Sequence, residues 1–173
     1  MKNMKFMTVS FMILISALMR FLPHPPNMTP VAAMALFAGA SFDRRKAAYL
    51  IPFLSLFISD IFLGFHPVMP FVYGSFLLTV VLGRGIKKPG LISVGGASVA
   101  SSVLFFLITN FGHWAVTLMY PKTMSGLITC YAAGVPFFRN ALFGDLMYSA
   151  GLFGIFSWAA RAYPSLREKP LTA

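Results

Sequence analysis

Long apolar runs separated by short polar or proline-rich breaks make up most of this chain. A helix of about 20 apolar residues is long enough to cross a bilayer. The runs lie at about residues 6–22, 29–42, 47–64, 70–83, 91–118 and 125–161. Because proline removes a backbone hydrogen bond, we expect Pro136 to break the last run into a short segment and a helix from about 136 to 160.

The composition indicates a membrane protein. Of the 173 residues, 58% are hydrophobic and only 10% are charged, which is unusual for a soluble domain. We therefore predict an all-α integral membrane bundle of about six transmembrane helices, with residues 1–173 forming a single domain. Residues 1–19 resemble a signal peptide, but no small-x-small cleavage site follows them, so we expect them to remain as the first span.

The positive charges indicate the orientation. A net charge of +10 could point to nucleic-acid binding, but the cations occur in small groups between the apolar runs. Threading from a cytoplasmic N-terminus puts these groups inside and leaves only Lys122 in the outer loops. The inner cations are Lys2, Lys5, Arg44, Arg45, Lys46, Arg84, Lys87, Lys88, Arg161, Arg167 and Lys169. Both termini are thus predicted to be cytoplasmic, and no nucleic-acid partner is expected.

Four charged residues interrupt the apolar runs, namely Arg20, Asp60, Arg139 and Asp145. An ionisable side chain within a bilayer is costly, so it usually faces a partner, a cavity or a substrate. Arg20 lies at the outer end of its run and can reach the interface. Counted from Pro136, Asp145 lies roughly 14 Å deep, close to the middle of a hydrocarbon core about 30 Å thick.

Most other polar side chains of the spans gather in the predicted outer half. They are Asn27, Asn110, His113 and Asn140, and together with Asp60 and Arg139 they suggest a cavity that opens outward and tapers toward Asp145. Asn110 and His113 share one face of their helix with Phe106 and Thr117.

The partners of the buried charges remain open at this stage. Asp145 could reach Asn110 or water in the cavity, whereas Arg139 could meet Asp60 or a substrate anion; Arg20 competes for Asp60. A purely structural alternative also stands, because polar groups hold membrane helices together, and Asp145 could be satisfied by residues one turn further on.

Metal and enzyme chemistry have weak support. His24, His66 and His113 show no ligand spacing, and the single cysteine, Cys130, has no second thiol. No nucleophile elbow, His-Glu-x-x-His motif or phosphate-binding loop occurs. We expect no metal site, no cofactor and no enzymatic activity.

Several segments resemble a bacterial family of small membrane proteins without an assigned function. They are RFLPHPPNMTPVAAMALFAGA at residues 20–40, SD at 59–60, LGFH at 63–66, residues 106–112, YP at 120–121, and residues 130–145 with PFFRN and GD. That family is in turn similar to the six-helix S components of energy-coupling factor (ECF) vitamin transporters, with the cobalamin-binding members nearest.

The resemblance implies uptake of a ligand through an outward cavity, in the inner (plasma) membrane of a bacterium. It also implies docking on an ECF-type coupling subunit with ATPases, for which S components usually present Ala-x-x-x-Ala on the first span. The first span here has no such pair of small residues, so operation without an ATPase module stays open.

Three hypotheses follow. The leading one is a transport component that captures a small, vitamin-like nutrient from outside, with aromatic side chains as apolar walls. Its predicted binding residues are Asn27, Asp60, Tyr73, Asn110, His113, Arg139, Asn140 and Asp145. The second is a non-transporting membrane subunit that assembles a complex through its buried charges. The third is an intramembrane enzyme using a pair such as His113 with Asp145.

Overall fold

The computed structural model describes residues 2–166, and every regular element in this part of the chain is helical. The α-helices are α1 (Lys2–Leu18), α2 (Val31–Ser41), α3 (Arg45–Leu63), α4 (Met69–Arg84), α5 (Leu91–Val116) and α6 (Met124–Ala162). Two short 3-10 helices, η1 (Met19–Phe21) and η2 (Pro164–Leu166), extend α1 and follow α6. The prediction of an all-helical bundle with six helices is confirmed.

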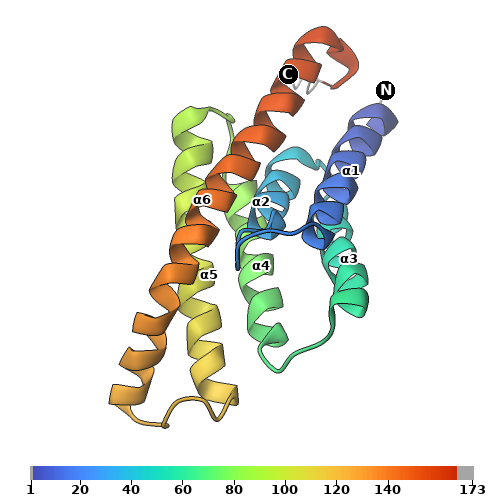
Figure 1. The fold of residues 1–173 in the computed structure, drawn as a ribbon. Coiled ribbons are helices and arrows are strands. Elements are labelled where there is room, and N and C mark those ends of the chain that lie inside the picture. Colours follow the sequence, from blue (N-terminus) through green and yellow to red (C-terminus); the bar gives the residue numbers. More distant parts are fainter. Residues whose placement is uncertain (1, 167–173) are drawn as a thin grey trace.

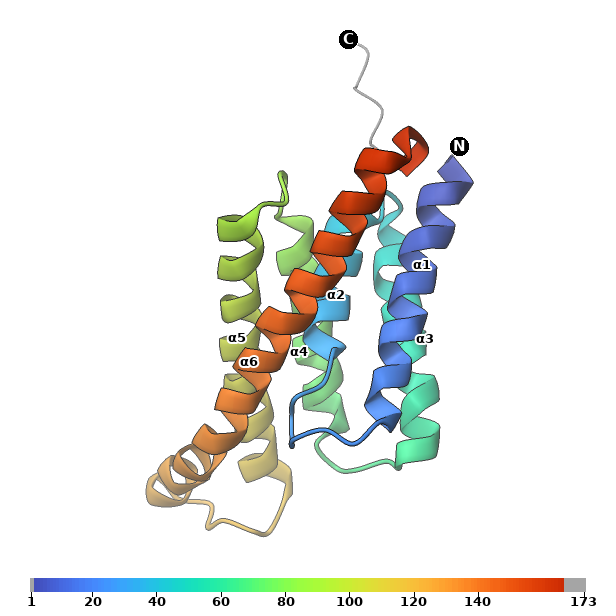
Figure 2. The ribbon, with the colours of Figure 1, turned by 45° about the horizontal axis from the view of Figure 1, so that its top comes forward.

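Successive helices run in alternating directions, as Figures 1 and 2 show. One end of the bundle, called here the basic end, carries the start of α1, the connections 42–44 and 85–90, and the end of α6. The opposite end carries the connections 22–30, 64–68 and 117–123. The cation groups between the apolar runs therefore gather at one end, as the threading predicts.

Within residues 2–166, three helical segments are long and apolar enough to cross a membrane, namely Met4–Phe21, Arg45–Leu63 and Leu91–Val116. Helices α2 and α4 are apolar but shorter. With 11 residues, α2 is about 16 Å long, which is less than the hydrocarbon core of a bilayer. The number of complete crossings therefore stays a prediction.

Helix α2 is the centre of the bundle. It packs against each of the other five α-helices, and its residues 33–38 are at most 1% exposed. This explains its alanine-rich sequence, because a helix that is apolar on all sides needs small side chains if several neighbours are to approach it. Phe37 fills the space toward α6, where its ring packs edge-on against Phe153 at 5.2 Å.

Helices α2 and α4 approach each other through two glycines. A Cβ atom added to Gly39 would overlap the carbonyl oxygen of Val80, and one added to Gly83 would overlap that of Leu36. Both obstacles are backbone atoms, which cannot rotate away. Glycine is thus required here by the closeness of the two helices.

Helix α6 runs without a break through Pro136, so the predicted break at this residue is wrong. The helix has 39 residues and is about 58 Å long. Side chains on both sides of the proline anchor the helix to α5: the Tyr131 hydroxyl donates to the Leu107 carbonyl oxygen at 2.7 Å, and Ser102 donates to Asp145 at 2.6 Å. These contacts hold α6 against α5 on both sides of the proline.

Candidate functional site

Asp60 near the end of α3 is enclosed in a polar cluster. Its side chain is 9% exposed, and its Oδ1 atom lies 2.6 Å from Nη2 of Arg20 in η1. The Tyr73 hydroxyl on α4 donates to Asp60 Oδ2 at 2.7 Å. Arg20 also donates to Ser59 and to the Leu56 carbonyl oxygen. Of the two partners considered for Asp60, the structure selects Arg20, so the interpretation of Arg20 as an interfacial residue is wrong.

Asp145 on α6 lies in a second buried cluster, which it shares with serines. It is 4% exposed, and the Ser102 hydroxyl on α5 donates to its Oδ2 atom at 2.6 Å. One turn closer to the basic end, the Ser149 hydroxyl donates to Ser98 Oγ at 3.4 Å. Ser98, Ser102 and Ser149 are each at most 1% exposed. We call these four residues the Asp145–serine cluster.

Asn110 is not the partner of Asp145. It donates to the carbonyl oxygen of Phe106 on its own helix, and its side-chain oxygen lies against Gly134. The depth estimate placed Asp145 wrongly because it took Pro136 as the start of the helix, whereas α6 begins at Met124. On the antiparallel helix α5, this brings Ser102 rather than Asn110 beside Asp145.

His113 lies near the opposite end, with its ring 6.1 Å from that of Tyr120. Its Nδ1 atom is buried and has no hydrogen-bond partner among the described residues. Ser102, which contacts Asp145, is about 16 Å away along α5. A catalytic pair of His113 and Asp145 is therefore not formed.

Arg139 and Asn140 line a recess of about 680 Å³, which we call the Arg139 recess. Asn140 donates to the carbonyl oxygen of Pro26 at 3.1 Å, so the connection 22–30 lies against α6 at this point. Asn27 shapes the connection through its left-handed backbone, with φ of 63°. Arg139 is exposed and forms no hydrogen bond or ion pair within the described part of the chain. The recess is otherwise lined by Met28, Pro136, Leu142, Phe143 and Leu146.

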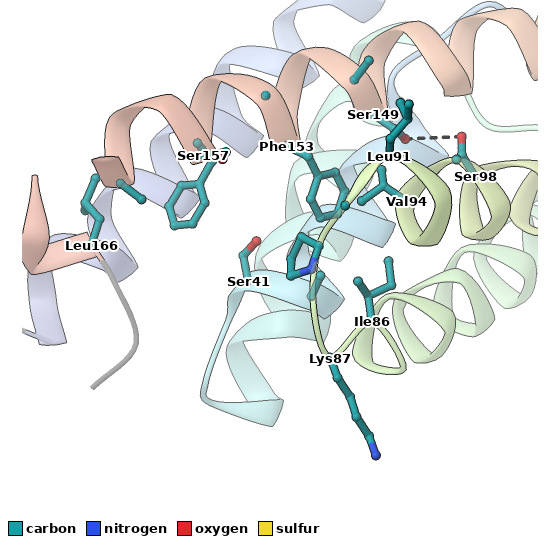
Figure 3. A pocket seen from close by; sticks show the side chains of 18 of the residues that line it. Ser41, Ile86, Lys87, Leu91, Val94, Ser98, Ser149, Phe153, Ser157 and Leu166 are labelled. Carbon is teal, nitrogen blue, oxygen red and sulfur yellow. Dashed lines mark hydrogen bonds between the residues drawn. The ribbon is translucent and has the colours of Figure 1, made fainter. Parts of the chain in front are cut away.

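A second cavity, also of about 680 Å³, opens at the basic end and is called here the basic-end cavity. Its α6 wall runs from Ser157 past Phe153 to Ser149, and Ser98 of α5 faces Ser149 there (Figure 3). Lys5, Lys87 and Arg161 are part of its lining. Most of its surface is apolar. Instead of one cavity that tapers toward Asp145, the described residues thus form a cavity at the basic end and a recess beside the connection 22–30, and Asp145 lines neither.

The predicted binding residues consequently fall into separate groups. Asp60 and Tyr73 belong to the polar cluster around Arg20. Asn110 lies against Gly134 of α6, and His113 lies beside Tyr120. Asn27, Arg139 and Asn140 lie at or beside the Arg139 recess, and Asp145 lies in the serine cluster. The serines escaped the sequence analysis because they sit on an apolar run that close helix packing explains equally well.

In the part of the chain that the structure describes, no three His, Cys, Asp or Glu side chains come close enough to hold a metal ion. The Cys130 thiol is buried and donates to the Asn110 carbonyl oxygen at 3.4 Å. This hydrogen bond joins α6 to α5, so the thiol contributes to the packing of these two helices.

A family model, described as a family of unknown function (DUF6580), matches residues 1–166. The chain belongs to this family. Searches of curated proteins and of solved structures found no match. The expectation that the chain belongs to a family without an assigned function is thus confirmed, while the likeness to ECF S components stays a prediction.

Proposed function

We propose that this protein is a multi-pass membrane transport protein that takes up a small, vitamin-like nutrient across the plasma membrane of a bacterium. The main support is a pair of cavities, one opening at the basic end and one beside the connection 22–30, which both extend to Leu146 on α6. A carrier has to offer its ligand access from each side in turn, and two cavities that end at the same level provide for this.

Arg139 is the group that we assign to ligand recognition. A guanidinium without a partner in the described residues favours an anion, and its planar donors match a carboxylate or a phosphate. Asn140 beside it adds an amide whose oxygen remains able to accept a hydrogen bond. The ligand is therefore a small molecule with at least one carboxylate or phosphate and an apolar part that fits the recess.

The alternative of a non-transporting assembly subunit has less support. It requires buried charges that seek a partner in another chain. The charge of Asp60 is already balanced by Arg20 at 2.6 Å, which leaves it little attraction for a second protein. The proposal covers both uptake by this chain alone and uptake together with an ATPase module.

The test is a thermal-stability screen of the purified full chain in detergent. The panel contains carboxylate- and phosphate-bearing vitamins, cobalamin and its precursors, and transition metals. A ligand that binds the folded state raises the melting temperature. We expect an anionic compound to do so, Arg139→Gln to abolish the effect, and Arg45→Gln at the basic end to retain it. A ligand effect that survives Arg139→Gln would reject the assigned recognition group, and no effect from any compound would reject the proposal.

A further inference from the structure

Asp145 is a buried acid without a cation. It is 4% exposed, and none of the described residues forms an ion pair with it. Its hydrogen-bond partner is the hydroxyl group of Ser102, and the hydroxyl groups of Ser149 and Ser98 bond to each other one turn away. A carboxylate that is removed from water usually either has a partner or binds a proton.

The number of hydrogen-bond donors in the cluster indicates that Asp145 can bind a proton. The Ser102 Oγ atom lies 2.6 Å from Asp145 Oδ2 and 3.1 Å from the Ser98 carbonyl oxygen. A serine hydroxyl has one hydrogen, so it can donate to only one of these two acceptors at a time. With a proton on Asp145, the acid donates to Ser102 and Ser102 donates to Ser98, so both contacts become hydrogen bonds.

The cluster lies against the basic-end cavity and next to the residue that both cavities share. Ser98 and Ser149 belong to the wall of the basic-end cavity, and the dashed line in Figure 3 marks their contact. Leu146, which directly follows Asp145, is part of the lining of both cavities. The two cavities therefore meet at Leu146, one residue from Asp145, and both are large enough for water.

We propose that Asp145 is a proton-coupling site. It takes up a proton from one cavity while that cavity is open, and it releases the proton into the other cavity once the bundle has closed the first and opened the second. This inference rests on the proposed transport function. On uptake, an O–H bond forms at a carboxylate oxygen and the Ser102 hydroxyl turns to the Ser98 carbonyl oxygen. On release, this O–H bond breaks, the proton passes to water, and Ser102 donates to the carboxylate again.

Among the described residues, no ionisable group other than Asp145 belongs to the cluster; the connection 22–30, whose Met28 lies against Gly144, carries His24, which is exposed. Helix α2 contains none, and neither does η2. On α5 the ionisable residue is His113, 11 positions beyond Ser102. On α6 the nearest are Tyr148, which packs against the core, and Arg139, about 9 Å away along the helix. A change that depends on pH and on Asp145 can therefore be assigned to its carboxyl group.

The first experiment measures proton binding directly. The full chain is reconstituted in vesicles, and infrared difference spectra between acidic and alkaline pH are recorded for the protein, for Asp145→Asn and for Asp43→Asn. Asp43 is a surface acid at the basic end that pairs with Lys5 at 2.8 Å. We expect a protonated-carboxyl band that disappears in Asp145→Asn and persists in Asp43→Asn. A spectrum that Asp145→Asn leaves unchanged would overturn the inference.

The second experiment measures the coupling. In a Cys130→Ser background, single reporters Ser157→Cys in the basic-end cavity and Phe143→Cys in the Arg139 recess are labelled with a maleimide at several pH values. Because the thiolate is the reacting form, each rate is divided by that of the same reporter in the denatured chain at the same pH. We expect the two normalised rates to change in opposite directions with pH, and Asp145→Asn to lose this dependence. Rates that follow sodium concentration instead of pH, or that do not depend on Asp145, would overturn it.

The design separates this inference from the proposed function. If an anionic compound binds but the rates are independent of pH, transport stands and proton coupling fails. If the rates depend on pH through Asp145 but no compound binds, coupling stands and nutrient uptake fails. Should Asp145→Asn not fold, Ser102→Ala retains the acid and removes its hydrogen bond, so the pH at which the infrared band appears must shift.

Discussion

The ion pair between Arg20 and Asp60 allows a quantitative test of whether this cluster supports the fold or binds a ligand. The two side chains are 14% and 9% exposed, so water screens their attraction only weakly. Removing one partner of a buried pair leaves an uncompensated charge and costs about 3–5 kcal/mol. Asp60→Asn and Arg20→Gln are each expected to lower the free energy of unfolding by about that amount.

The double variant supplies the decisive comparison. With Arg20→Gln and Asp60→Asn together, neither charge is left unpaired, and the two amides can hydrogen-bond to each other. We expect the double variant to be more stable than either single variant, because the coupling within such a pair amounts to about 0.5–3 kcal/mol. Equilibrium unfolding in mixed micelles, followed by circular dichroism as the denaturing detergent increases, measures all four free energies.

The opposite pattern would refute this reasoning. If both single variants unfold like the unchanged protein, the pair does not stabilise the bundle. If Asp60→Asn in addition loses a ligand-induced thermal shift that Arg20→Gln retains, Asp60 is a binding residue and the structural interpretation is wrong.

Two further predictions concern packing and hydrogen bonding. Gly83→Ala is expected to destabilise the bundle by about 1–3 kcal/mol because its Cβ would overlap the backbone of α2. Gly74→Ala on the same helix has nothing within 4 Å of the new atom and should stabilise the bundle by about 0.5–1 kcal/mol. Equal unfolding curves for the two variants would show that α2 and α4 do not approach each other closely at Gly83. Tyr73→Phe removes the donor to Asp60 and should lower the free energy of unfolding by about 1.5–3 kcal/mol in the same assay. Tyr49→Phe, the control, should change it by no more than about 0.5 kcal/mol. Equal losses of stability in the two variants would contradict the hydrogen bond from Tyr73 to Asp60.

The helices and their order could be predicted from the sequence because apolar runs and their breaks act locally. The prolines of residues 23–26 end the first run, and the groups of cations mark the connections at the basic end. Pro136 was misjudged for a physical reason: its effect depends on whether a neighbouring helix holds both sides of the proline in line. That support comes from α5 and is a tertiary contact.

The pairing of the charges could not be predicted, because depth along a helix says nothing about direction around the bundle. Arg20 and Arg139 both lie toward the end at which α3 terminates, so either could have reached Asp60. The choice follows from the packing of α1 against α3, whereas α6 lies against α2 and α5. Likewise, the neighbour of Asp145 depends on the register between α5 and α6, which the true start of α6 determines.

The two buried carboxylates, Asp60 and Asp145, differ in their partners, and this difference distinguishes a structural role from a functional one. Asp60 has a guanidinium at 2.6 Å and a phenol at 2.7 Å, so the fold itself accounts for its charge. Asp145 accepts a hydrogen bond from Ser102 and has no ion pair among the described residues, and an apolar contact between α5 and α6 would hold these helices together at least as well. A costly group that the bundle does not need has to be explained by what the protein does. Arg139 at the recess is likewise a charged group without a partner in the described residues. An anion bound to Arg139 and a proton bound to Asp145 would together leave neither charge uncompensated.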